Sequence, residues 1–176
     1  MLHMLSKKKV LYSSLTLMVT MFIVVMFYVN PSIDGGNGSS VIELQLSFSK
    51  ENGSKILAQW GSLGIESFKS LIVADYIYAL SYSLFFASLL SFLILKKGKG
   101  LLFRYTIVVP ISFMAGTLDW IENTIELFFI SNQAQLPEAV FFTHSIIATL
   151  KWATIPVAVI YIIVLLSNKS EVAQMK

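Results

Sequence analysis

Four long apolar stretches divide the sequence, and each is long enough to cross a bilayer. They cover residues 10–29, 71–95, 105–130 and 139–166. A helix needs about 20 apolar residues to span a hydrocarbon core of about 30 Å. The last three stretches exceed that minimum, which predicts tilted helices or extensions into the interface. The pattern therefore predicts an all-α, polytopic membrane four-helix bundle that forms a single membrane domain over residues 1–176.

The first apolar stretch has two interpretations, because Lys7–Lys9 precede it. A basic segment followed by an apolar one is typical of a cleaved signal peptide, whose apolar part has about 7–15 residues. The stretch Val10–Val29 is longer than that, and no small-x-small cleavage site follows it. We therefore expect an uncleaved membrane anchor.

Lysine and arginine residues lie in alternate connections between the predicted spans. The tails and the connection between spans two and three carry Lys7, Lys8, Lys9, Lys96, Lys97, Lys99, Arg104, Lys169 and Lys176. The connection 131–138 has none, and the loop 30–70, about 40 residues long, has three lysines against four acids. Because cytoplasmic segments are rich in basic residues, both termini are predicted to be cytoplasmic and the loop 30–70 extracytoplasmic.

The composition supports a membrane protein and excludes several functions. Hydrophobic residues make up 56% of the chain and charged residues only 13%, against about 25% charged in a soluble domain. The basic clusters are short and adjoin apolar stretches, so we expect no nucleic-acid partner. There is no cysteine, which excludes disulfides, thiolate nucleophiles and cysteine-ligated zinc.

Within the outer loop, Val41–Ser49 alternates apolar and polar residues. A period of two is typical of a short amphipathic strand. No second strand is predicted to pair with it, so a helical or irregular segment stays open. After it, Ser54 is predicted to cap a short helix through Trp60 that breaks at Gly61 and Gly64.

The third predicted span carries a stripe of polar residues. Asp119, Glu122, Asn123 and Glu126 are spaced i, i+3, i+4 and i+7, which places them on one helix face about 100° wide. A charged residue at the bilayer centre raises the free energy of membrane insertion by about 2.5–3.5 kcal/mol, whereas Leu, Ile or Phe lowers it by about 0.3–0.6 kcal/mol. The stripe is therefore predicted to face the interior of the bundle.

The neighbouring spans carry matching polar faces. These consist of Asp75, Tyr78, Ala79 and Tyr82 on span two, and His144, Ala148 and Lys151 on span four. On span three the small residues Ser112, Ala115 and Gly116 extend the polar stripe and predict a close helix contact. From their depth, Lys151 is expected to pair with Asp119, and His144 with Glu122 or Glu126.

Acids outnumber bases in this interior. Its ionisable residues are Asp75, Asp119, Glu122 and Glu126, with Lys151 and His144. Carboxylates that lie close together in a low dielectric cannot all ionise. The sequence therefore predicts either protonated acids or a bound cation.

Three functions fit this pattern. The first is an outward-facing intramembrane site that binds or translocates a proton, a cation or a small ligand, with a homodimer expected for translocation. The second is a membrane-embedded acid/base or metal-assisted enzyme acting on a lipid-like substrate. The chain has no H-E-x-x-H, G-x-S-x-G or phosphate-loop motif. The third is an accessory or assembly subunit of a membrane complex.

The same residues also fit a structural role, in which they hydrogen-bond between helices and fix the bundle. We favour a functional site because ionisable groups inside membranes generally mark one. Apart from the lipid bilayer, the sequence identifies no definite partner, and it names no cofactor. The candidate site residues are Asp75, Tyr82, Asp119, Glu122, Asn123, Glu126, His144 and Lys151.

Several short motifs carry a family resemblance. They are Gln59-Trp60-Gly61 with Gly64, Asp75 with Tyr82, Leu118-Asp119-Trp120-Ile121-Glu122-Asn123, and Leu150-Lys151-Trp152. Over about residues 46–166 the chain resembles a family of uncharacterised bacterial four-span integral membrane proteins. The resemblance implies a bacterial inner-membrane protein in which Asp75, Asp119, Glu122, Asn123 and Lys151 belong together, and it implies no activity. Glu126 and His144 lie outside the family pattern.

Overall fold

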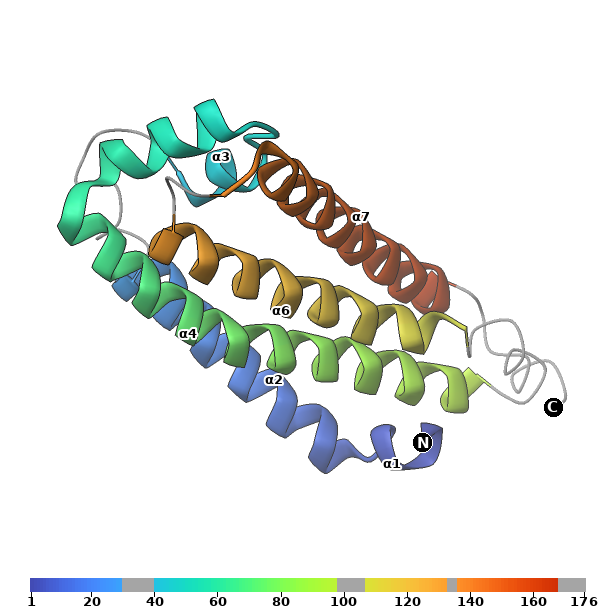
Figure 1. Ribbon diagram of the computed structural model, residues 1–176. Coiled ribbons are helices and arrows are strands. Elements are labelled where there is room, and N and C mark those ends of the chain that lie inside the picture. Colours follow the sequence, from blue (N-terminus) through green and yellow to red (C-terminus); the bar gives the residue numbers. More distant parts are fainter. Residues whose placement is uncertain (30–39, 98–106, 133–135, 168–176) are drawn as a thin grey trace, which may run out of the picture.

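The computed structural model describes residues 1–29, 40–97, 107–132 and 136–167, which form an all-helical fold (Figure 1). The predicted all-α class is thus confirmed. The elements are α1 (Leu2–Leu5), α2 (Lys8–Ile23), the π-helical η1 (Val24–Val29), α3 (Val41–Gln45), α4 (Lys50–Lys97), α6 (Val108–Asn132) and α7 (Glu138–Ser167). Several sequence predictions lie outside the described residues: the loop segment 30–39, the start of span three at 105, and the charges of Lys99, Arg104, Lys169 and Lys176.

Three of the described helices are long and apolar enough to cross a membrane. They are Lys8–Phe27, Lys50–Lys97 and Glu138–Ser167. Helix α6 has 25 residues but is not among the three, since its stripe of acids and asparagine lowers its hydropathy. The predicted four-span arrangement therefore remains a prediction.

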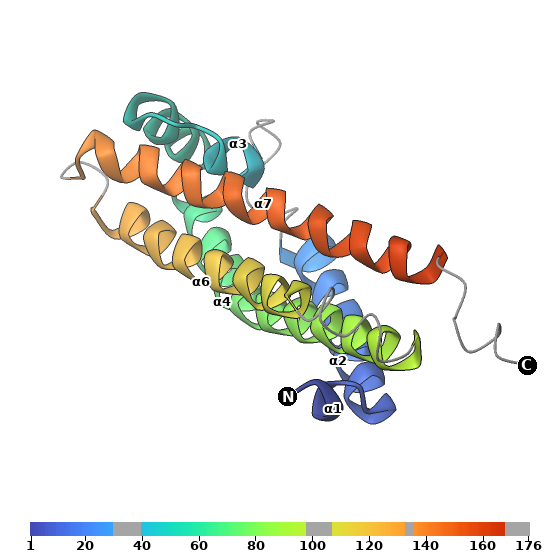
Figure 2. The same ribbon diagram turned by 90° about the vertical axis from the view of Figure 1, so that its right-hand side faces the viewer.

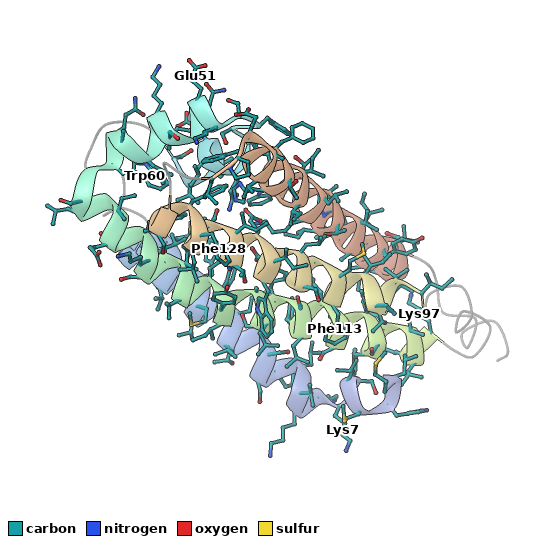
Figure 3. The ribbon with its side chains drawn as sticks, in the orientation of Figure 1. Lys7, Glu51, Trp60, Lys97, Phe113 and Phe128 are labelled. Carbon is teal, nitrogen blue, oxygen red and sulfur yellow. The ribbon has the colours of Figure 1, made fainter. Side chains whose placement is uncertain are left out.

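The long helices form an open bundle. Helix α6 packs against α4 on one side and α7 on the other, and α2 packs against α4. Figures 1 and 2 both show α2 and α7 at the two flanks of the α4–α6 pair. Lys7 and Lys97 lie at the end of the bundle that carries α1, whereas Glu51 and Trp60 lie at the opposite end (Figure 3).

Helix α4 changes direction at Gly61, which has φ 63° and ψ −171°. Side chains strongly disfavour this backbone conformation, so glycine permits the bend. The segment before the bend covers one end of the bundle, and the segment after it runs beside α2 and α6 (Figure 1). The predicted break at Gly61 is confirmed, whereas the one at Gly64 is wrong, because Gly64 lies within regular helix.

The first segment of α4 begins at Lys50, five residues earlier than Lys55, which would follow the predicted cap at Ser54. Ser49 explains the difference. Its Oγ accepts a hydrogen bond from the backbone N–H of Asn52 at 3.2 Å, which satisfies a free donor of the first turn.

The predicted strand at Val41–Ser49 is wrong, because α3 occupies Val41–Gln45. A capping box starts this helix: Ser40 Oγ accepts from Glu43 N at 3.2 Å, and Ser40 N donates to Glu43 Oε2 at 2.8 Å. A lone strand would leave its backbone groups unpaired, whereas a helix pairs them internally. Past α3, the N–H of Phe48 donates to Ser145 Oγ at 2.9 Å, which ties the segment to α7.

Helices α4 and α6 approach closely at Gly116. A Cβ atom there would overlap Ser83 Oγ and lie 3.0 Å from the carbonyl oxygen of Ala79. Ser112 and Ala115 on the same face are buried. The small residues thus allow the close contact that the sequence predicts.

Two apolar clusters bracket the polar centre of the bundle. One includes Leu90 and Ile94 of α4 and Leu165 of α7, at the end that carries α1. The other includes Phe129 and Phe141 near the opposite end. Along α4, α6 and α7 alike, the candidate site residues fall between these clusters, so apolar packing closes the polar region from both ends.

Candidate functional site

Lys151 and Asp119 form the central ion pair. Lys151 Nζ donates to Asp119 Oδ1 at 2.9 Å and lies 2.6 Å from Glu122 Oε2. The Tyr82 hydroxyl donates to Asp119 Oδ2 at 2.9 Å. The predicted pairing of Lys151 with Asp119 is confirmed. The same ammonium group also forms an ion pair with Glu122, one turn further along α6.

Asp75 and Asn123 form a second contact between α4 and α6. Asn123 Nδ2 donates to Asp75 Oδ2 at 3.0 Å. Asn123 is buried, whereas Asp75 is only partly buried. The amide thus orients a carboxylate that remains accessible from one side.

His144 lies near both of the acids that the sequence predicts as its alternative partners. Its Nε2 lies 3.2 Å from Glu126 Oε1 and 3.9 Å from Glu122 Oε1. All three residues are 0% exposed. The rings of His144 and Phe129 pack edge to face, with centroids 4.8 Å apart. We call Glu122, Glu126 and His144 the sealed group.

Gln45 is the site residue that the sequence analysis missed. It is buried on α3, its side chain lies beside the Glu126 carboxyl, and its Oε1 accepts a hydrogen bond from Trp152 Nε1 at 3.1 Å. The strand prediction placed Gln45 on a polar outer face. The Ser40–Glu43 spacing of the capping box is the signal that could have corrected it.

A cavity of about 430 Å³ opens beside the ion pair. Its polar base includes Asp75, Tyr82, Asp119 and Lys151, which we call the cavity-facing group. Its walls come from α2, η1, α3, α4 and α7, and include Met18, Val25, Met26, Val41, Ile42, Leu71, Phe86, Trp152 and Ile155. The sealed group does not line the cavity and lies behind the ion pair. The structure thus combines one accessible polar surface with one closed cluster.

The eight candidate residues come together as predicted. The polar stripe of α6 faces the interior, since Asp119 is 3% exposed, Asn123 1%, and both glutamates 0%. Lys151 connects the two groups by contacting Asp119 and Glu122. Asp75 lines the cavity, and the buried Asn123 donates a hydrogen bond to it.

Comparison of the chain with protein-family models, curated proteins and solved structures finds no match. The family resemblance of the short motifs therefore stays a prediction. The geometry of the two polar groups is the evidence from which a function is inferred.

Proposed function

We propose that this chain is a multi-pass membrane protein that binds a small ligand or a cation within the membrane, at Asp75, Asp119 and Lys151. The observation that carries the proposal is the cavity of about 430 Å³ with these three side chains at its base. Ligand pockets typically measure about 300–1,000 Å³ and combine apolar walls with a few fixed polar groups. This cavity has both features.

The proposal includes α6 as a fourth span. Its 25 residues give a length of about 37 Å at 1.5 Å per residue. Its charged side chains are buried, whereas Met114, Ile121 and Phe128 are exposed, as a lipid-facing surface requires. Lys7 and Lys97 lie at one end of the bundle (Figure 3). With the basic residues of the tails, they favour cytoplasmic termini and a site in the outer half of the membrane. We place the protein in a bacterial inner membrane on the motif resemblance.

The shape of the cavity favours a ligand that is apolar at one end and cationic at the other. Met18, Val25 and Met26 on one wall and Ile155 on the other offer apolar contact. At the base, Asp119 shares Lys151 with Glu122, and Asp75 has an amide as its partner. A positive group placed beside Asp75 would offset the remaining negative charge.

Native mass spectrometry of the full chain in mild detergent tests this proposal. We expect a bound small molecule in the wild type and its loss in Met18→Trp, because the larger ring fills the cavity. Val19→Trp is the matched control, since Val19 is 44% exposed and does not line the cavity. Equal occupancy in the two variants, or no bound species in the wild type, would contradict the proposal.

The absence of cysteine allows a second test. Tyr78→Cys places a thiol on the cavity wall, and Ala148→Cys places one at a position with 0% exposure. A water-soluble maleimide should label the first and spare the second, and the bound ligand should slow labelling of the first. Equal labelling of both thiols would show that the cavity is not the accessible surface.

A further inference from the structure

The sealed group has the composition and spacing of a metal site. Glu122 and Glu126 lie one turn apart on α6, and His144 faces them from α7. One ligand atom from each residue lies within 4.8 Å of the other two. We propose that Glu122, Glu126 and His144 bind one divalent transition-metal ion of the zinc class. Helical bundles commonly build metal sites in this way, from carboxylates and imidazoles that project from facing helices.

Buried oxygen atoms without partners provide independent support. Within the described residues, Glu122 Oε1 and Glu126 Oε2 make no hydrogen bond, although both residues are 0% exposed. A buried carboxylate oxygen that lacks a partner is strongly destabilising. A cation beside His144 Nε2 would satisfy Glu122 Oε1, which lies 3.9 Å from that nitrogen, and would compensate the charge of the Glu126 carboxylate.

Lys151 contacts one of the two carboxylate oxygens of Glu122, and the other faces His144. Its ammonium lies 2.6 Å from Oε2, which leaves Oε1 on the side of His144. Because the same ammonium also binds Asp119 at 2.9 Å, its single charge compensates Asp119, and the charges of Glu122 and Glu126 remain. One divalent ion with a neutral imidazole would balance those two charges.

The distances favour a small transition-metal ion. Zinc binds carboxylate oxygen and imidazole nitrogen at about 2.0–2.2 Å, which places tetrahedral donors about 3.3–3.6 Å apart. His144 Nε2 is 3.2 Å from Glu126 Oε1 and 3.9 Å from Glu122 Oε1, so small side-chain shifts would suffice. Calcium and magnesium prefer sites built of oxygen alone, whereas an imidazole ligand favours zinc and its neighbours.

Surrounding residues support the proposed ligands. The Gln45 amide lies beside the Glu126 carboxyl, and Lys151 forms an ion pair with Glu122, as outer groups commonly do around metal ligands. His144 Nδ1 makes no hydrogen bond within the described part of the chain, so Phe129 and the two carboxylates set the ring orientation. The ion would thereby fix α3, α6 and α7 relative to one another, whether or not the cavity holds a ligand.

Elemental analysis of the full chain, purified in detergent without chelator and with any affinity tag removed, tests the metal site. We expect about one zinc-class ion per chain in the wild type. Metal content should fall at least about tenfold in Glu126→Gln and His144→Gln, which each remove a ligand. His3→Gln and Glu138→Gln are matched controls that should retain the ion, because His3 is the chain's other histidine and Glu138 is an exposed acid.

Two further measurements need no folded variant. Addition of Zn²⁺ to metal-stripped wild type should raise the unfolding temperature, and Mg²⁺ should not. Cobalt loading should give the visible absorption bands of four- or five-coordinate Co²⁺. A wild type that neither retains an ion nor responds to Zn²⁺ or Co²⁺ would overturn the proposal in favour of carboxyl groups that hold protons. Unchanged metal content in both ligand variants would overturn it as well.

These outcomes are separable from those of the cavity proposal. Met18→Trp should retain its metal, because Met18 lines the cavity and not the sealed group. A chain that binds metal but no cavity ligand would contradict only the proposed function. The reverse result would contradict only the metal site.

Discussion

The cavity-facing group and the sealed group differ in how their carboxylates are compensated. Asp119 receives hydrogen bonds from Lys151 and Tyr82, and Asp75 receives one from Asn123 beside an open cavity. In the sealed group, Glu122 and Glu126 each keep a buried oxygen without a hydrogen bond in the described structure. Water can enter the first group but not the second. The same kind of substitution should therefore change the unfolding free energy by different amounts in the two groups.

The largest effect is expected from Lys151→Met, because Lys151 contacts carboxylates of both groups. Removing one partner of a buried ion pair typically costs about 3–5 kcal/mol of unfolding free energy. Asp119 and Glu122 would both lose their cation. Chemical denaturation in detergent measures the change. Lys96→Met, which removes an exposed lysine, serves as the control, and an equal small loss in both variants would show that the pair is not buried in the folded protein.

A smaller loss is expected from Gln45→Leu, because Gln45 lies beside the sealed group at the edge of the cavity. The replacement has a similar volume but cannot accept the hydrogen bond from Trp152 Nε1 or offer an amide to Glu126. Gln45 is only 6% exposed, so the cost should be about 1–3 kcal/mol. Denaturation with and without added Zn²⁺ measures it. No loss under either condition would mean that Gln45 does not support Glu126.

Asn123→Leu makes a comparable change next to Asp75 of the cavity-facing group and should cost less. Water in the cavity can hydrate Asp75 after the amide is removed, so we expect a loss of about 0.5–1.5 kcal/mol. Ligand occupancy should fall more clearly than stability, since the orientation of Asp75 is lost. If Asn123→Leu costs more than Gln45→Leu in parallel denaturation, cavity water does not hydrate Asp75 and the cavity-facing group is not open.

The smallest effect is expected from Glu66→Gln, which breaks the exposed pair of Lys69 and Glu66 at 2.6 Å. Solvent-exposed ion pairs contribute about 0–1 kcal/mol, so the unfolding free energy should change by at most about 0.5 kcal/mol. The same denaturation assay provides the baseline for the buried groups. A loss above 1 kcal/mol, on the order of a buried hydrogen bond, would show that membrane-border pairs do not behave as ordinary surface pairs.

The sequence was sufficient to predict the helices and the side chains that meet between them. The i, i+3, i+4, i+7 spacing and the cost of charge in lipid fix the inward face of α6, and depth alone pairs Lys151 with Asp119. These predictions depend on local geometry and on distance from the membrane surface. Both can be computed from position in the chain.

The sequence was not sufficient to predict α3, Gln45 or the cavity. Over five residues, a helix and a strand can place the same apolar side chains, so Val41–Gln45 is ambiguous without its cap. The cavity depends on the separation of α2 from α7, and after Lys9 helix α2 has no charged residue that would indicate which neighbour it leaves uncovered. Only the three-dimensional packing contains that information.

The bend at Gly61 limits how this protein can diverge in evolution. A residue with a side chain at φ 63° and ψ −171° would store about 1–3 kcal/mol of strain. That is a substantial share of the stability of a typical domain. Descendants of this sequence should therefore keep glycine at this position, while the exposed residues Ser62 and Leu63 that follow it change freely. A deep collection of homologues would reveal the bend as one invariant column followed by two variable ones.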